Sequence, residues 1–147
     1  MFPAKTLLEV EKFMVDQEQV WCPVFHKFSP GLYIRELHMP VDTIVLGHYH
    51  RFPNLCFFEK GKLAFHNDDG TNTIMEAPQV FTAPPGRKLA YVMEEAIFTN
   101  ILLNPDNEQD VNKLEDIFFD KSVALPSSYG CFTEIEEATL CPESHQQ

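Results

Sequence analysis

The feature that most constrains this chain is a succession of short apolar runs with a period of two between Val20 and Leu103. Alternation places successive side chains on opposite faces of a strand, so each run predicts a half-buried β-strand. The predicted strands cover 20–27, 32–38, 42–50, 55–60, 61–67, 71–76, 79–82, 88–93 and 96–103. Turn residues such as Asp69-Gly70 separate them. About nine short strands at this spacing are typical of a β-sandwich or a β-barrel.

Helical periodicity replaces the strand pattern at both ends of this region. Residues 6–15 begin with a capping box of Thr6 and Glu9, and their apolar positions recur every three or four residues. This stripe consists of Leu7, Val10 and Met14, with Leu8 beside them. A second amphipathic segment, 106–121, predicts a C-terminal helix with its acidic face outward. The apolar stripe of that helix consists of Val111, Leu114, Ile117 and Phe118.

The charge of the chain is concentrated in its last third. The 147 residues carry a formal net charge of −11, and nearly all of the acidity lies after residue 93. Because contacts with a phosphate backbone need clustered cations, this acidity argues against binding of long nucleic acid. It does not exclude a small anion in a pocket of the nearly neutral remainder.

Hydropathy argues against a membrane or secreted protein. No apolar run approaches the roughly 18 residues of a membrane-spanning helix, and the first residues lack the apolar core of a signal peptide. The four cysteines show no CxxC spacing, which favours reduced thiols. We therefore expect a cytoplasmic protein.

The strongest chemical signal is Gly47-His48-Tyr49-His50. Strand alternation places His48 and His50 on one face, about 7 Å apart. Two imidazoles facing a barrel interior chelate a divalent metal, whereas two solvent-facing or hydrogen-bonded histidines give the same pattern. The motif by itself leaves both interpretations open.

The surrounding residues resemble the cupin superfamily over 20–104. The first cupin motif has a His-x-His followed by an acid and a glycine, here matched by His48, His50 and Gly61. The second motif begins Pro-x-Gly, matched by the Pro84–Gly86 turn. The stretches 28–40 and 83–88 are similar to the small single-domain cupins often carried by phages and prophages.

The resemblance implies an all-β, cupin-type double-stranded β-helix barrel (a jelly roll) with a short helix at each end. The implied organisation is an N-terminal arm over 1–19, a barrel over 20–104, a helix over 105–121 and a flexible acidic tail over 122–147. Such barrels commonly pair, so a homodimer or larger homo-oligomer is expected. A phage origin would place the protein in the cytoplasm of a bacterial host.

The resemblance also implies an incomplete metal site. His48 and His50 match two of its ligands and would bind Fe, Mn, Ni or Zn weakly. Asn54 stands where the family has an acid, and Leu89 falls at the position of the second-motif histidine. Tyr91 shares the strand face of Leu89 and offers a phenol oxygen.

Cations next to the two motif turns add an anion-binding hypothesis. Arg51 and Arg87, with Lys88 beside them, would lie near one mouth of the barrel and clamp a phosphate or carboxylate. The alternative is that they are solvated surface cations. Cys56 is expected to fill the core rather than to act as a nucleophile.

Three functions follow from these residues. The first is capture of a small ligand, anionic or nucleotide-like, in a pocket around His48 and His50, as in a phage accessory protein. The second is a metal-dependent enzyme, either a sugar isomerase or epimerase or a dioxygenase, using the same histidines. The third is a non-catalytic scaffold acting through the acidic C-terminal region. Whether the protein is an enzyme stays open.

Overall fold

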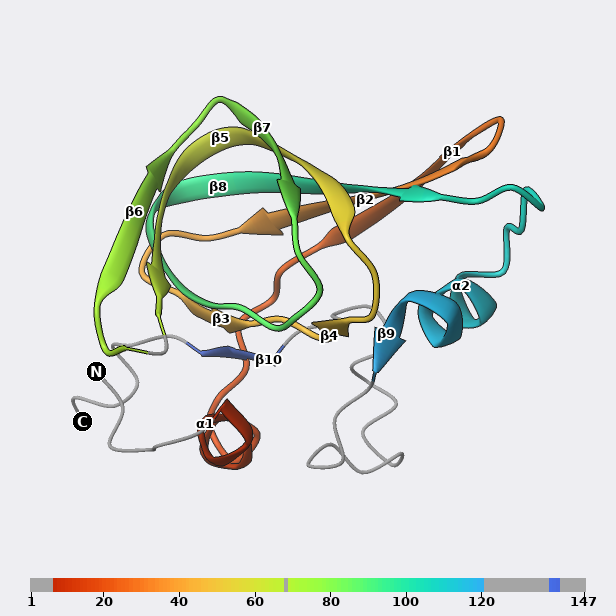
Figure 1. Cartoon of the computed structure of the whole chain (residues 1–147). Helices are drawn as coiled ribbons and strands as arrows, with labels where there is room; N and C mark the ends of the chain where they lie inside the picture. Colours follow the sequence, from red (N-terminus) through yellow and green to blue (C-terminus); the bar gives the residue numbers. More distant parts are fainter. Residues whose placement is uncertain (1–6, 68, 121–137, 141–147) are drawn as a thin grey trace.

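The computed structural model describes residues 7–67, 69–120 and 138–140 (Figure 1). The strands are β1 (Val24–Ser29), β2 (Leu32–Met39), β3 (Ile44–Leu46), β4 (Tyr49–His50), β5 (Asn54–His66), β6 (Asn72–Glu76), β7 (Gln79–Ala83), β8 (Leu89–Leu103), β9 (Phe119–Asp120) and β10 (Ala138–Leu140). The helices are α1 (Leu7–Met14) and α2 (Val111–Phe118). The chain is therefore mainly β, as the strand pattern predicts, with the two short helices that the helical periodicity predicts.

The long strand β8 organises the barrel. It pairs antiparallel with β2, β3 and β5, while β1 extends the sheet beyond β2 and β10 extends it beyond β3. The strand β5 also pairs with β6 and β7, and this group curls over β3 to enclose the barrel interior (Figure 1). The short strands β4 and β9 form a separate pair beside it.

Two predicted strand breaks are absent. The segments 55–60 and 61–67 form the single strand β5, and 88–93 and 96–103 form the single strand β8. Gly61 does not make a hairpin turn. Its φ of +98° accommodates shifts in the β5–β8 register, and a Cβ there would lie 2.3 Å from the carbonyl oxygen of Glu95. The glycine therefore permits a close backbone crossing inside one continuous strand.

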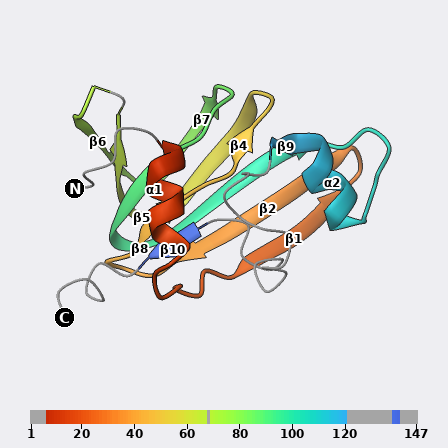
Figure 2. The ribbon, with the colours of Figure 1, turned by 90° about the horizontal axis from the view of Figure 1, so that it is seen from below.

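The helix α1 covers the outer side of β3 and the start of β8 (Figure 2). Its Val10 and Met14 pack with Ile44, Leu46 and Leu89, which confirms the predicted apolar stripe. Glu11 on the same face is fully buried, contrary to a simple amphipathic pattern, because it forms a 2.5 Å ion pair with Arg87. Thr6 of the predicted capping box lies outside the described residues.

The helix α2 begins at Val111, later than predicted. The Asp110 side chain accepts hydrogen bonds from backbone amides of the first turn, so it caps the helix. The prediction of an outward acidic face is wrong at Glu115, which is buried, and Ile117 of the predicted stripe is half exposed. The reason is that Leu114 and Phe118 pack with Tyr33 and Leu102, so this face of α2 turns toward the sheet, and Glu115, three residues before Phe118, lies on the same face.

The remaining boundary and assembly predictions stay predictions. Most of the tail over 122–147 lies outside the described residues, but 138–140 form β10, which the sequence pattern did not predict. The homo-oligomer is likewise untested. Among the described residues, none of the helices is long and apolar enough to span a membrane.

Candidate functional site

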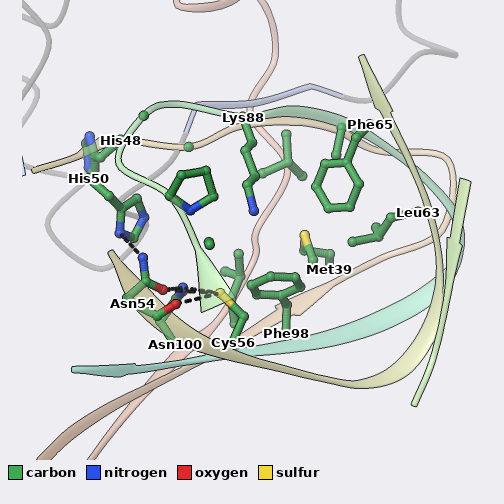
Figure 3. A pocket seen from close by; sticks show the side chains of 17 residues that line it. Met39, His48, His50, Asn54, Cys56, Leu63, Phe65, Lys88, Phe98 and Asn100 are labelled. Atoms are coloured by element: carbon green, nitrogen blue, oxygen red, sulfur yellow. Dashed lines mark hydrogen bonds between the residues drawn. The ribbon is translucent and has the colours of Figure 1, made fainter. Parts of the chain in front are cut away.

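A cavity of about 70 Å³ opens into the barrel interior (Figure 3). Its lining comes from β2, β3, β4, β5, β7, β8 and the connections after β3 and β7. The apolar part includes Leu37, Met39, Val45, Leu63, Phe65, Ala83, Ala90 and Phe98. The polar part consists of His48, His50, Asn54, Cys56, Asn100 and Lys88. Figure 3 shows the histidines and asparagines gathered at one end and Leu63 and Phe65 at the other.

Both predicted histidines line this cavity. His48 stacks on Phe119 with ring centroids 5.7 Å apart, and His50 meets the same ring edge-on at 4.8 Å. The backbone of His50 exchanges two hydrogen bonds with Gly86, of 2.9 and 3.0 Å. The histidine segment is therefore held between β9 on one side and the Pro84–Gly86 turn on the other.

A row of hydrogen bonds continues from His50 along the polar end. The Asn54 Nδ2 group lies 3.4 Å from Nδ1 of His50, and Oδ1 of Asn54 accepts from Nδ2 of Asn100 at 2.8 Å. The Cys56 thiol also donates to Oδ1 of Asn54, at 3.2 Å. An amide nitrogen only donates, so this arrangement makes Nδ1 of His50 an acceptor and leaves its proton on Nε2.

The surroundings keep His50 neutral. Burial, the charge of Arg35 and the charge of Lys88 together lower the pKa of His50 to about 4. Burial also raises the pKa of the Cys56 thiol, although the charge of Lys88 opposes this rise. At neutral pH the polar end therefore presents an uncharged imidazole and a protonated thiol.

Lys88 brings the positive charge of the cavity. Its Nζ lies 5.1, 5.4 and 6.0 Å from the ring centroids of Phe81, Phe65 and Phe98. The side chain extends toward the middle of the cavity, between its polar and apolar ends (Figure 3). The residue as a whole is exposed, yet desolvation lowers its pKa.

The three other predicted site residues lie outside this cavity lining. Tyr91 shares the face of Leu89 as predicted, but that face packs toward α1, and its hydroxyl donates to Asp42. Arg51 forms an exposed ion pair with Asp120 at 2.7 Å. Arg87 pairs with Glu11 and donates to the carbonyl of Gly47, so it supports the rim from outside.

The residues present do not fit a metal site with three or more protein ligands. Among residues 7–67, 69–120 and 138–140, no cluster of three His, Cys, Asp or Glu side chains is placed to hold a metal ion. The Asn54 oxygen is already occupied by Asn100 and Cys56, and Leu89 faces away from the cavity. Zinc sites normally use at least three protein ligands, so His48 and His50 form an incomplete set.

Sequence reasoning does not place Lys88 or Asn100 in the site. It interprets Lys88 as a cation of the barrel mouth beside Arg51 and Arg87, and it does not consider Asn100. The expectation that Cys56 belongs to the core is confirmed, since Cys56 is buried, but its side chain also lines the cavity. The missed signal was parity: in a strand continuing from Leu89, Lys88 and Ala90 face opposite to Leu89 and Tyr91. The neutral Asn100 carries no motif, and only the β5–β8 register, which sets Asn100 opposite Cys56, reveals it.

Comparisons with known proteins give structural neighbours but no family. No protein-family model matches the sequence, and no curated protein matches it significantly. Similar solved structures include an RmlC-like cupin family protein with a double-stranded β-helix fold from Methanocaldococcus jannaschii (14% identity, 63% of this chain and 86% of that chain, TM-score 0.47). A cupin-2 domain containing protein from Shewanella frigidimarina is 14% identical, with 68% of this chain and 96% of that chain covered and a TM-score of 0.43.

An acetylacetone dioxygenase from Acinetobacter johnsonii is also similar, at 15% identity, with 58% of this chain and 65% of that chain covered and a TM-score of 0.43. The neighbours thus include cupins, one described with the double-stranded β-helix fold that the sequence motifs imply. They assign no family. At these identities and TM-scores, nothing about metal, substrate or activity is carried over to this chain.

Proposed function

We propose that this protein binds a small organic anion with an apolar body inside the barrel. The observation that carries the proposal is Lys88, the one formally charged side chain among the cavity-lining residues. In the part of the chain that the structure describes, no carboxylate forms an ion pair with it. A carboxylate on a ligand would supply the missing counter-ion and form a charge-assisted hydrogen bond.

The other lining residues define the rest of such a ligand. The side chains of Met39, Phe65 and Phe98 offer an apolar surface next to the lysine. The polar end offers the Nε2 proton of His50 as a hydrogen-bond donor. A volume of about 70 Å³ is far below the roughly 300–1,000 Å³ of pockets for drug-sized ligands. This size favours a short carboxylate over a nucleotide.

Calorimetric titration with short monocarboxylates of increasing chain length tests the proposal. We expect saturable binding that Lys88→Met weakens at least tenfold, because a charge-assisted hydrogen bond contributes about 1.5–3 kcal/mol. Lys62→Met is the matched control, since Lys62 pairs with Glu76 and does not line the cavity. Equal binding by both variants, or binding of neutral amides as tight as that of carboxylates, contradicts the proposal.

The metal-dependent alternative is tested on the same protein. A tag-free preparation is dialysed against Fe, Mn, Ni or Zn, and its metal content is compared with that of His48→Ala/His50→Ala. From the incomplete donor set we expect no stoichiometric, histidine-dependent retention. Stoichiometric metal lost in the double variant would restore the enzyme hypothesis. The scaffold hypothesis concerns mostly residues outside the described ranges and stays a prediction.

A further inference from the structure

The placement of Lys88 has a chemical consequence beyond charge recognition. Its Nζ lies among three phenyl rings, while the residue as a whole is exposed to solvent. Among the described residues it forms no ion pair, whereas Lys27, Lys60, Lys62 and Lys113 each face a carboxylate at 3.0–3.8 Å. The ring faces favour the ammonium form, whereas desolvation and the absence of a carboxylate favour the neutral amine, and the pKa of Lys88 is lowered on balance.

We propose that the Lys88 amine forms a Schiff base with a small aldehyde or ketone that enters the barrel cavity. The proposal goes beyond anion binding, because it uses the nitrogen lone pair of the lysine instead of its charge. Desolvation lowers the pKa of Lys88, which acts in the same direction as the missing carboxylate. An apolar pocket that activates a lysine in this manner is a recognised route to a nucleophilic amine.

The reaction balances without an oxidant or reductant. The lone pair of Nζ forms a bond to the carbonyl carbon, and the oxygen takes the proton that the nitrogen releases. The resulting carbinolamine then loses its hydroxyl group as water after one more proton reaches the oxygen. The nitrogen lone pair closes the C=N bond as the C–O bond breaks, which gives the protonated imine and one water. The nitrogen then returns its proton to the donor, so the net change is one imine formed and one water released.

The cavity supplies groups suited to the second step. The Cys56 thiol, kept protonated by burial, is the proton donor for the oxygen, and the neutral His50 ring offers its Nε2–H only as a hydrogen bond to that oxygen. Both line the same cavity as Lys88. The side chains of Met39, Phe65 and Phe98 limit the number of water molecules there, which favours loss of water from the carbinolamine. The small volume restricts the carbonyl compound to a few carbon atoms.

Borohydride trapping tests this inference on the full-length protein. Propanal at low molar excess is added at neutral pH, the imine is reduced, and peptide mass spectrometry measures the propyl group on each lysine. We expect Lys88 to be alkylated at least tenfold faster than Lys60 and Lys27, which are exposed and ion-paired. Alkylation of Lys88 at or below the rate of those two lysines would overturn the inference.

A charge-conserving variant separates this reaction from anion binding. Lys88→Arg keeps the positive charge but has no amine that forms a neutral imine, so the fast adduct disappears. The same variant should bind a short carboxylate more tightly than Lys88→Met. If carboxylates fail to bind but fast trapping at Lys88 persists, anion binding is wrong and the Schiff base stands. The reverse pattern, binding without fast trapping, rejects the Schiff base alone.

Discussion

His50 shows how the cavity changes the chemistry of one side chain. Its backbone is fixed against Gly86, its ring against Phe119, and its Nδ1 against Asn54. Burial and two nearby cations, Arg35 and Lys88, disfavour protonation of the ring. The sequence motif identified the histidine but gave no indication of its protonation, which depends on residues brought together by the fold.

The lowered pKa of His50 predicts a specific pH dependence of stability. The ring protonates near pH 6.5 in the unfolded chain and near pH 4 in the folded one, so acid favours the unfolded state across that window. The free energy of unfolding should fall by about 3 kcal/mol more in the wild type than in His50→Gln as the pH drops through it. Urea denaturation at several pH values measures the difference.

The exposed His66 supplies the control for this measurement, because His66→Gln removes a histidine outside the cavity. Its pH profile should run parallel to that of the wild type. Parallel profiles for wild type and His50→Gln would show that His50 titrates alike in both states and would contradict the prediction.

At the scale of single residues, the motif residues His48, His50 and Asn54 all line the cavity. Tyr91 does not, because the face that it shares with Leu89 points toward α1. Strand alternation tells which residues share a face but not which face points into the barrel. The resemblance places a cavity residue at Leu89, whereas in the structure Lys88 and Ala90, on the opposite face, line the cavity.

Among the elements, α1 has the clearest structural role. Its Glu11 pairs with Arg87, and Arg87 also donates to the carbonyl of Gly47 at the cavity rim. The pair is largely excluded from solvent, with the Glu11 side chain 0% and the Arg87 side chain 12% exposed. The helix therefore connects both motif turns from outside the barrel.

Breaking this pair should destabilise the protein strongly. Glu11→Leu leaves Arg87 buried without its carboxylate, and we expect the free energy of unfolding to fall by about 3–5 kcal/mol. Replacing both partners, as in Glu11→Leu/Arg87→Met, should recover part of the loss. Lys27→Met breaks the exposed pair with Glu36 and should cost less than about 1 kcal/mol. Urea denaturation measures the free energy of unfolding of each variant. Equal losses for Glu11→Leu and Lys27→Met would reject a structural role for the buried pair.

The crossing of β5 and β8 makes a second prediction at this scale. Gly61 and Gly70 both have positive φ, but of these two only Gly61 would bring an added Cβ within 3 Å of backbone atoms. Gly70→Ala should cost about 1–2 kcal/mol of strain alone. Gly61→Ala should cost several kcal/mol more, because β8 would have to move. Thermal unfolding of the two variants compares them, and similar losses would show that the crossing tolerates a methyl group.

Element boundaries were predicted well where local signals act alone. The 72–76 strand and the α1 helix follow turn and periodicity rules, and both appear where expected. The continuity of β5 and of β8 was not predictable, because a glycine at a crossing and a glycine at a turn look alike in sequence. The burial of Glu11 was missed for a related reason: its partner Arg87 is distant along the chain.

For the whole molecule, the alternation of short apolar runs predicts a β-sandwich or a β-barrel, helical periodicity predicts a helix at each end, and only the resemblance to cupins selects the barrel. The concentration of acidic residues after position 93 separated the surface charge from the charge of the cavity. This separation matters for function: the chain as a whole has a net charge of −11, whereas, among the described residues, the only formally charged side chain lining the cavity is the positive Lys88. The global charge gave no information about this site.

The central position of β8 affects how the protein is made. Every other long strand of the barrel precedes β8 in the chain. Because β2, β3 and β5 each pair with β8, one edge of each of these strands stays unpaired until β8 has been synthesised. During synthesis the β1–β2 and β5–β6 hairpins are available early, but their apolar faces have nothing to close against until residue 103 has emerged. Such long-range pairing slows folding and prolongs exposure of strand edges. The nascent chain should therefore depend on chaperones until this one strand is complete.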